Sequence, residues 1–340
     1  MLINHSSATQ ALDLGRRVAQ CYGFSSEATL TAFPLTENWT FRVEDQRGPD
    51  PVVVRIYRPG VKSRDEVRSE LAWMAALREE GLPVPAIVPS RDGSQLVEFS
   101  PEPDSEPLFC AAFDSAPGRE PSDDELPSWF PRLGDFTARL HRHARHWRRP
   151  PWFTRMRWGL ETTLGPRAHW GSWEASVPDP EERRQHGRLA EVVSVRLARF
   201  GEGPERFGLV HADLRLANLL VDGDQVTILD FDDCGESWYL YDLAATLTFN
   251  EGRPDVDELI ASWVDAYRRV EPLSREDESE IKTFLMLRRL MLSAYVGLRP
   301  DTELAREMRE AGYSAETCSL AEPYLAAHSG IASDASRERG

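Results

Sequence analysis

Residues 207–242 constrain the fold of this 340-residue chain more than any other stretch. Within them, two short apolar runs at 219–221 and 226–229 flank the sequence D-G-D at 222–224. Apolar runs separated by an Asp/Gly turn predict a β-hairpin. A hairpin brings the residues on its two sides to one end, so the polar side chains at those positions are expected to gather.

The side chains next to the predicted hairpin are oxygen donors. Asp213 and Asn218 precede it, and Asp230, Asp232 and Asp233 follow it. Gathered carboxylate and amide oxygens suit a divalent cation, and a carboxylate also suits a base that receives a hydroxyl proton. The alternative is a plain hairpin with solvated acidic turns, because Asp and Asn are common in turns.

The spacing H-x-D-x-x-x-x-N from His211 to Asn218, followed by Asp230, matches the catalytic set of the protein-kinase superfamily. More closely, H-A-D-L-R-L-A-N, L-D-F-D-D and Y-D-L-A resemble the aminoglycoside-phosphotransferase-like family. That family also includes choline kinases, one type of homoserine kinase and bacterial stress-response Ser/Thr kinases. The resemblance implies an α+β, bilobal, protein-kinase-like fold, with a small antiparallel β lobe around one main helix and a larger, mostly helical lobe. It also implies ATP and Mg²⁺ as cofactors.

The resemblance gives each acidic residue a role. Asp213 would be the base that deprotonates the acceptor, or the group that orients it, and Asn218 and Asp230 would hold Mg²⁺. Asp232 and Asp233 extend the second acidic cluster, where either could be a further metal ligand or face a substrate amine. Of these two we assign Asp232 to the metal.

Three more residues of this stretch are assigned by resemblance. His211 would support the catalytic loop through hydrogen bonds, and Asp242 would be a buried cap behind that loop. Arg215 lies where superfamily members often place a cation that contacts the moving phosphoryl group, although the aminoglycoside-phosphotransferase branch commonly has His there.

Residues 1–113 are expected to form the nucleotide-binding lobe. V-V-V-R-I-Y-R-P-G and S-E-L-A-W-M-A-A-L resemble the strand and the helix that carry a phosphate-contacting cation and its Glu partner. The cation is lysine in most members, whereas here it is Arg55, with Glu70 as the matching acid. An arginine can bind phosphate oxygens bidentately. The alternative is an exposed Arg/Glu pair worth under ~1 kcal/mol.

No G-x-G-x-x-G phosphate loop is present. Asn38, in a polar E-N turn, is assigned to cover the phosphates instead, and a plain surface turn explains it equally well. Kinase-like folds bind adenine at the hinge between lobes, which we place near 111–118, so Phe113 is assigned to nucleotide binding. Leu220 is assigned to the floor under the adenine, with an ordinary core leucine as the alternative.

Residues 114–330 are expected to form the catalytic and substrate lobe, and 331–340 a disordered tail. An insertion near 150–175 holds four of the ten tryptophans. Aromatic faces attract ammonium groups, which would fit an amine substrate; a packed cap without a ligand role is the alternative. Further helices are predicted over 7–22, 126–147, 181–200, 254–270 and 274–298.

Composition excludes several classes of partner. The net charge of −16 argues against nucleic acid, whose phosphates need a basic footprint. Four cysteines far apart are typical of reduced thiols in a cytoplasmic protein. We find no signal-like pattern and no apolar run long enough for a membrane span.

The sequence therefore predicts a cytoplasmic ATP- and Mg²⁺-dependent phosphotransferase. Its acceptor would be a hydroxyl of a small molecule: an amine-bearing alcohol, an amino acid or an aminoglycoside-like compound. One alternative is a protein Ser/Thr kinase of the bacterial stress-response type, so a protein substrate stays open. A second alternative is a nucleotide-binding pseudokinase. The oligomeric state and the choice of ATP over GTP are not determined by these motifs.

Overall fold

The computed structural model describes residues 8–34, 38–46, 48–102 and 104–329. The predicted tail at 331–340 lies outside the described residues. The chain divides into two compact units. The N unit holds the described residues of 1–120 together with 148–155 and 219–232, and the C unit holds 121–147, 156–218 and the described residues after 232. The predicted hairpin thus groups with the N unit, although it lies beyond the lobe boundary predicted at residue 113.

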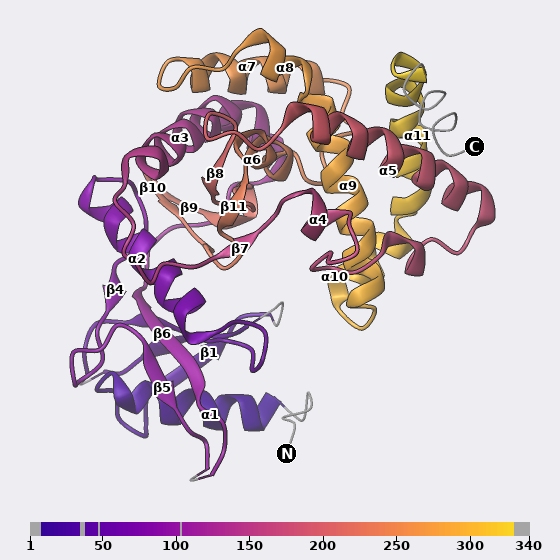
Figure 1. Cartoon of the computed structure of the whole chain (residues 1–340). Helices are drawn as coiled ribbons and strands as arrows, with labels where there is room; N and C mark the ends of the chain where they lie inside the picture. Colours follow the sequence, from indigo (N-terminus) through magenta and orange to yellow (C-terminus); the bar gives the residue numbers. More distant parts are fainter. Residues whose placement is uncertain (1–7, 35–37, 47, 103, 330–340) are drawn as a thin grey trace. The chain divides into compact units, whose positions relative to one another are not determined.

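The N unit is built on one antiparallel sheet (Figure 1). Its strand order is β1-β2-β3-β6-β4, and β5 pairs with β6. The strands are β1 (Thr29–Ala32), β2 (Trp39–Glu44), β3 (Val52–Ile56), β4 (Ile87–Val88), β5 (Val97–Phe99) and β6 (Leu108–Asp114). Every pairing in this sheet is antiparallel, as the sequence predicted.

Strand β3 positions Arg55 by alternation. Val52, Val54 and Ile56 are buried in the core of the N unit, so the residues between them point to the other face. The Arg55 side chain therefore points away from the apolar core. It is half-buried on the other face of the sheet and can contact polar partners there.

Two helices complete the N unit with the sheet: α1 (Ala8–Cys21) and α2 (Arg64–Glu79). A capping box opens α2. The Ser63 hydroxyl accepts the Glu66 N–H at 3.3 Å, and the Glu66 carboxylate accepts the Ser63 N–H at 2.8 Å. One turn later the helix buries Glu70. A carboxylate is rarely buried unless it is paired, so cations are expected next to it.

The predicted hairpin is confirmed as β9 (Leu219–Asp222) paired with β10 (Gln225–Ile228). Gly223 in its turn has φ of +59°, a conformation that glycine adopts without steric cost. The hairpin is fixed in the N unit by backbone hydrogen bonds of 2.8 and 3.0 Å between Val221 and Arg119.

The C unit is mostly helical (Figure 1). Its small sheet has the order β7-β11-β8, from β7 (Met156–Arg157), β8 (Phe207–Val210) and β11 (Gly235–Trp238). Its helices are α3 (Leu126–His146), α4 (Leu160–Thr163), α5 (Pro180–Phe200), α6 (Tyr239–Thr246), α7 (Val256–Arg268), α8 (Arg275–Ser279), α9 (Ile281–Leu298), α10 (Glu303–Glu310) and α11 (Tyr313–Ala327), with short 3₁₀ turns η1 (Asp123–Glu125), η2 (Trp173–Ala175) and η3 (Leu216–Asn218).

The single helix predicted over 274–298 is wrong. The chain breaks at Glu280, which ends α8 and precedes α9. Ser274 caps the short α8 by accepting the Asp277 N–H at 2.9 Å. Helix α9 that follows is buried over most of its length and packs against α6 and α5.

Helices α3 and α7 approach each other closely at Gly134. A Cβ atom on Gly134 would lie 2.5 Å from the carbonyl oxygen of Trp263. Only a residue without a side chain fits there, which lets α3 and α7 pack at short range.

No helix in the described part of the chain is both long and apolar enough to cross a membrane. All four cysteines are free thiols.

Candidate active site

The loop between β8 and the hairpin carries Asp213, whose two carboxylate oxygens both accept hydrogen bonds. Arg288 donates to Oδ1 at 2.7 Å. Asn218 donates to Oδ2 at 2.8 Å, and the Arg215 Nε donates to the same oxygen at 3.3 Å. Burial acts to raise the pKa of Asp213, but Arg215 and Arg288 outweigh it and hold that pKa below its ordinary value of 3.8.

Asn218 is oriented by its amide nitrogen. The Nδ2 atom donates to the Asp213 carbonyl oxygen at 2.7 Å as well as to the Asp213 carboxylate. Both bonds use the nitrogen, which leaves the amide oxygen as the atom that could bind a metal ion.

Asp242 at the start of α6 supports the same loop from behind. Its Oδ1 accepts the Ala212 N–H at 2.6 Å, and its Oδ2 accepts the His211 N–H at 3.1 Å. Ala212 has φ of +70°, which costs energy for a residue with a side chain. The His211 Nδ1 in turn accepts the Asp213 N–H at 3.3 Å. The strained loop is therefore held at successive backbone positions.

His141 of α3 also supports this loop, and the sequence motifs did not identify it. Its Nε2 lies 2.9 Å from the Asp242 Oδ2, and its Nδ1 lies 2.9 Å from the Tyr267 hydroxyl. Burial lowers the pKa of His141, so the ring is neutral and donates from Nε2 to the carboxylate. At the end of the same helix, the His146 Nδ1 lies 2.7 Å from the carbonyl oxygen of Arg142, one turn earlier.

Arg288 of α9 was also missed, although the sequence holds a signal for it. The segment F-L-M-L-R-R-L-M-L places two arginines inside an apolar helix, and a buried arginine needs acceptors. Besides Asp213, Arg288 donates to the Tyr241 hydroxyl at 2.8 Å and to the Thr248 hydroxyl at 3.1 Å.

In the N unit, the structure brings together Arg55, Glu70 and Asp230. The Arg55 Nη1 lies 3.4 Å from the Glu70 Oε1, and its Nη2 lies 3.0 Å from the Asp230 Oδ1. The guanidinium carbon also lies 5.8 Å from the centre of the Phe113 ring. Asp230 has φ of +58°, a second strained non-glycine residue, and its side chain is 43% exposed.

Asp232 has a different environment in the same unit. The Lys62 Nζ lies 3.3 Å from its Oδ1, and both Lys62 and Arg155 donate to its carbonyl oxygen. Burial acts to raise the pKa of Asp232, but Lys62, Arg55 and Arg155 together lower it. Sequence reasoning missed Lys62 and Arg155, because neither belongs to a motif.

Glu70 lies between these groups. Its Oε2 is 3.6 Å from the Arg155 Nη1, and its Oε1 accepts the Tyr57 hydroxyl at 3.0 Å. Burial, and then the neighbouring Asp232, raise the pKa of Glu70.

The remaining assigned residues have partners within the N unit. The Asn38 Oδ1 accepts the Arg58 N–H at 3.1 Å, so its side chain links the start of β2 to the segment after β3, while Glu37 lies outside the described residues. Leu220 is half-buried on β9, opposite Thr227 of β10. The metal ligands assigned from sequence fall in both units, with Asn218 in the C unit and Asp230 in the N unit.

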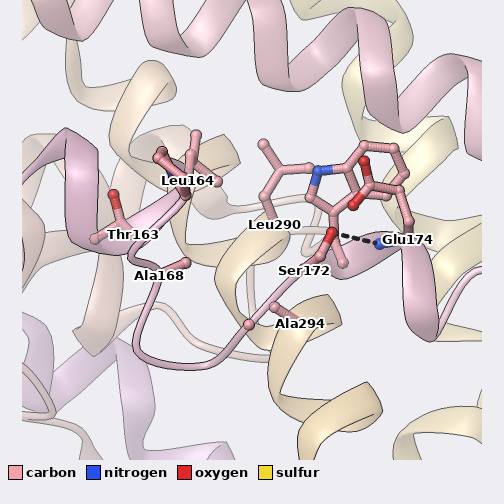
Figure 2. A pocket seen from close by; sticks show the side chains of 11 residues that line it. Thr163, Leu164, Ala168, Ser172, Glu174, Leu290 and Ala294 are labelled. Carbon is pink, nitrogen blue, oxygen red and sulfur yellow. Dashed lines mark hydrogen bonds between the residues drawn. The ribbon is translucent and has the colours of Figure 1, made fainter.

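The Trp-rich segment forms an aromatic cluster and a cavity in the C unit. Trp170 packs edge-on against Trp158 and Tyr295 at 5.3 and 5.6 Å. A cavity of about 310 Å³ lies beside this segment. Its walls include Ser172 and Glu174 of the segment and Leu290 of α9 (Figure 2). Because Leu290 follows Arg288 by two residues, it lies about 200° around the helix, on a different face from the Asp213 contact.

Comparison with known proteins identifies similar chains. The sequence pattern of the Phosphotransferase enzyme family matches residues 29–278. Amicoumacin kinase of Bacillus subtilis is 24% identical over 282 residues, covering 80% of each chain. Homoserine kinase of Methylobacillus flagellatus is 25% identical over 223 residues, covering 64% of each.

Two solved structures are similar over nearly the whole chain. The microcompartment-associated aminopropanol kinase is 36% identical with a TM-score of 0.84, over 93% of this chain and 98% of that one. Amicoumacin kinase hAmiN, in complex with AMP-PNP, Ca²⁺ and Ami, is 21% identical with a TM-score of 0.75, over 93% and 96%. The predicted kinase-like fold is confirmed.

Proposed function

This chain belongs to the phosphotransferase enzyme family, and we propose that it transfers the γ-phosphoryl group of ATP to a hydroxyl group of a small amine-bearing alcohol. The observation that carries the proposal is the 36% identity, over 93% of the chain, to an aminopropanol kinase. Aminopropanol has both a hydroxyl and an amine, which is the acceptor class that the sequence predicted.

Asp213 is the proposed acceptor-side group. It orients the acceptor hydroxyl and receives its proton. Support comes from its environment, since Arg288, Arg215 and Asn218 fix an ionised carboxylate that can accept a further hydrogen bond. We propose that His211 positions this loop and that Arg215 contacts the transferred phosphoryl group.

Arg55 is the proposed nucleotide-side cation. It donates to phosphate oxygens of ATP, and Glu70 orients it. Its ion pairs with Glu70 and Asp230 support this role, because they hold the guanidinium on the polar face of β3. Phe113, Leu220 and Asn38 are proposed nucleotide contacts on the family resemblance alone.

The amide oxygen of Asn218 and the carboxylate of Asp230 are the proposed Mg²⁺ ligands. These oxygen donors fit the preference of Mg²⁺, and the exposed side chain of Asp230 is compatible with ion binding. Bound Mg²⁺ would neutralise charge on the phosphates. Asp232 fits a metal less well, because Lys62 already balances its carboxylate, so we propose a structural role for it.

A screen for ATP consumption tests this function. The purified chain is incubated with ATP and Mg²⁺, and with 1-amino-2-propanol, ethanolamine, choline, homoserine, an aminoglycoside or casein as acceptor. We expect ADP release that depends on an amino alcohol, with the phosphate monoester of that acceptor visible by ³¹P NMR.

The other outcomes are distinguishable. Phosphate on casein and on no small acceptor would favour the protein-kinase alternative. ATP binding without turnover of any acceptor would favour a pseudokinase. Turnover of a sugar hydroxyl alone would keep the reaction and overturn the amine-bearing substrate.

A further inference from the structure

The hydrogen bonds to Asp213 distinguish its two oxygens. A carboxylate oxygen has about two lone-pair directions for hydrogen bonds. The Oδ2 atom accepts from both Asn218 and Arg215, so its two directions are filled. The Oδ1 atom accepts from Arg288 at 2.7 Å, and a second direction remains on it for another donor.

Arg288 is itself fixed by a set of partners on other elements. Its Nη1 donates to the Tyr241 hydroxyl of α6 at 2.8 Å, and its Nε donates to the Thr248 hydroxyl, just after α6, at 3.1 Å. The side chain is buried, and its guanidinium carbon lies 5.7 Å from the Trp170 ring. A guanidinium held at Nε, Nη1 and Nη2 cannot rotate away without losing hydrogen bonds that burial makes costly.

We propose that Arg288 is a positioning residue for phosphoryl transfer, which orients the Asp213 carboxylate so that Oδ1 receives the acceptor hydroxyl. This inference rests on the proposed function. The hydroxyl oxygen forms a bond to the γ-phosphorus as the bond from that phosphorus to the β–γ bridging oxygen breaks. ADP leaves with the electron pair of the broken bond, and the hydroxyl proton moves to Oδ1 and then to solvent.

The neighbouring Arg289 supplies a matched control on the same helix. It is also buried, but it donates to Thr317, Glu251 and Glu316 and has no hydrogen bond to Asp213 among those described. Replacing either arginine removes a buried guanidinium from α9. Only replacement of Arg288 removes the hydrogen bond to the Asp213 Oδ1, which leaves the carboxylate held through Oδ2 alone.

The test compares Arg288→Gln, Arg288→Lys and Arg289→Gln, with ATP, Mg²⁺ and 1-amino-2-propanol as the probe. For Arg288→Gln we expect kcat to fall about 100-fold, because small misplacements of a catalytic group have effects of that size, while the KM for ATP changes little. Arg288→Lys should recover part of the loss, because the ammonium can still donate to Oδ1. For Arg289→Gln, kcat of the folded protein should stay near wild type even if its stability falls.

A second variant keeps the inference testable if Arg288→Gln does not fold. The double variant Tyr241→Phe and Thr248→Val removes the hydroxyls that fix the guanidinium and keeps the guanidinium. It should lower kcat about 10-fold with an unchanged KM for ATP, an intermediate size because the Asp213 contact survives.

Equal kcat in Arg288→Gln and Arg289→Gln, with normal turnover by wild type, would overturn the positioning role alone. An unchanged kcat in the double variant would overturn it as well. No turnover by the wild-type protein with this probe would overturn the amino-alcohol function and the inference that rests on it.

Discussion

Two clusters of buried carboxylates, one in each unit, are held in different ways. In the N unit, Glu70 and Asp232 lie against cations: Arg55, Arg155 and Lys62. In the C unit, Asp242 lies against neutral donors, which are two backbone N–H groups and the ring of His141. Both arrangements compensate the loss of hydration, but only the first depends on paired charges.

The difference has a chemical consequence. Ion pairs among several charges can exchange partners, so a nucleotide phosphate could take the place of one carboxylate at Arg55. Hydrogen bonds to the backbone cannot exchange without unfolding the loop. The C unit therefore keeps a fixed scaffold beneath Asp213, and the N unit keeps cations that suit an anionic ligand.

The largest expected effect on activity comes from replacing Asp213. Its carboxylate accepts hydrogen bonds from the cations Arg288 and Arg215 and from the neutral amide of Asn218. Asp213→Asn keeps the volume and replaces one carboxylate oxygen with an amide nitrogen, so the proposed proton acceptor is lost. We expect kcat for phosphoryl transfer to fall by about 10²–10⁴-fold, the range for loss of a general base, with ATP binding retained. Steady-state kinetics and calorimetry measure the two quantities, with the exposed Asp222→Asn as control. Full activity in Asp213→Asn would remove its role in proton transfer.

A second prediction tests the ion pairs of the N unit. Lys62→Met leaves the Asp232 carboxylate buried without its lysine, and we expect a loss of about 3–5 kcal/mol in the free energy of unfolding, measured in urea. The side chains of Lys62 and Asp232 are 4% and 9% exposed.

The other lysine of the chain is the matched control. Lys282 pairs with Asp257 on the surface, and its side chain is 65% exposed. Lys282→Met should change the free energy of unfolding by less than about 1 kcal/mol. Equal losses in the two lysine variants would mean that burial of the Lys62 pair has no energetic importance.

The smallest expected effect is a pH dependence from the neutral donor of the C unit. The pKa of His141 is lowered by burial from its ordinary value of 6.5, so below about pH 6.5 the unfolded chain binds a proton that the folded chain does not. Stability from this group is complete above that pH and is lost as the pH falls towards the lowered pKa. The slope should weaken in His141→Gln and persist in His146→Gln, as measured by urea unfolding between pH 5 and pH 8.

Local signals in the sequence predicted the parts of the fold that depend on neighbouring residues. The D-G-D turn rests on a spacing of a few residues, and the hairpin that it predicted is confirmed. The Ser63 capping box and the alternation of β3 are features of the same local kind. The split between α8 and α9 was missed, because the polar run R-E-D-E-S-E at 275–280 contains neither proline nor glycine and so gives no sign of the break.

Such local signals could not predict contacts between residues that lie far apart in the chain. His141 and Asp242 are 101 residues apart, and Arg288 and Asp213 are 75 apart. A motif names the residue that does the chemistry, whereas the residue that supports it comes from whichever helix passes nearby. For Arg288, its place in an apolar helix indicated a buried polar contact, but it did not identify Asp213 as the partner.

Gly134 connects helix packing to the loop that carries Asp213. It lets α3 and α7 approach closely, and those helices carry His141 and Tyr267, whose side chains meet at 2.9 Å. An alanine would form a better isolated helix by about 1 kcal/mol, yet it would separate the helices and stretch that hydrogen bond. Glycine is therefore preferred over alanine at position 134, which is the opposite of the order that a helix-propensity scale gives.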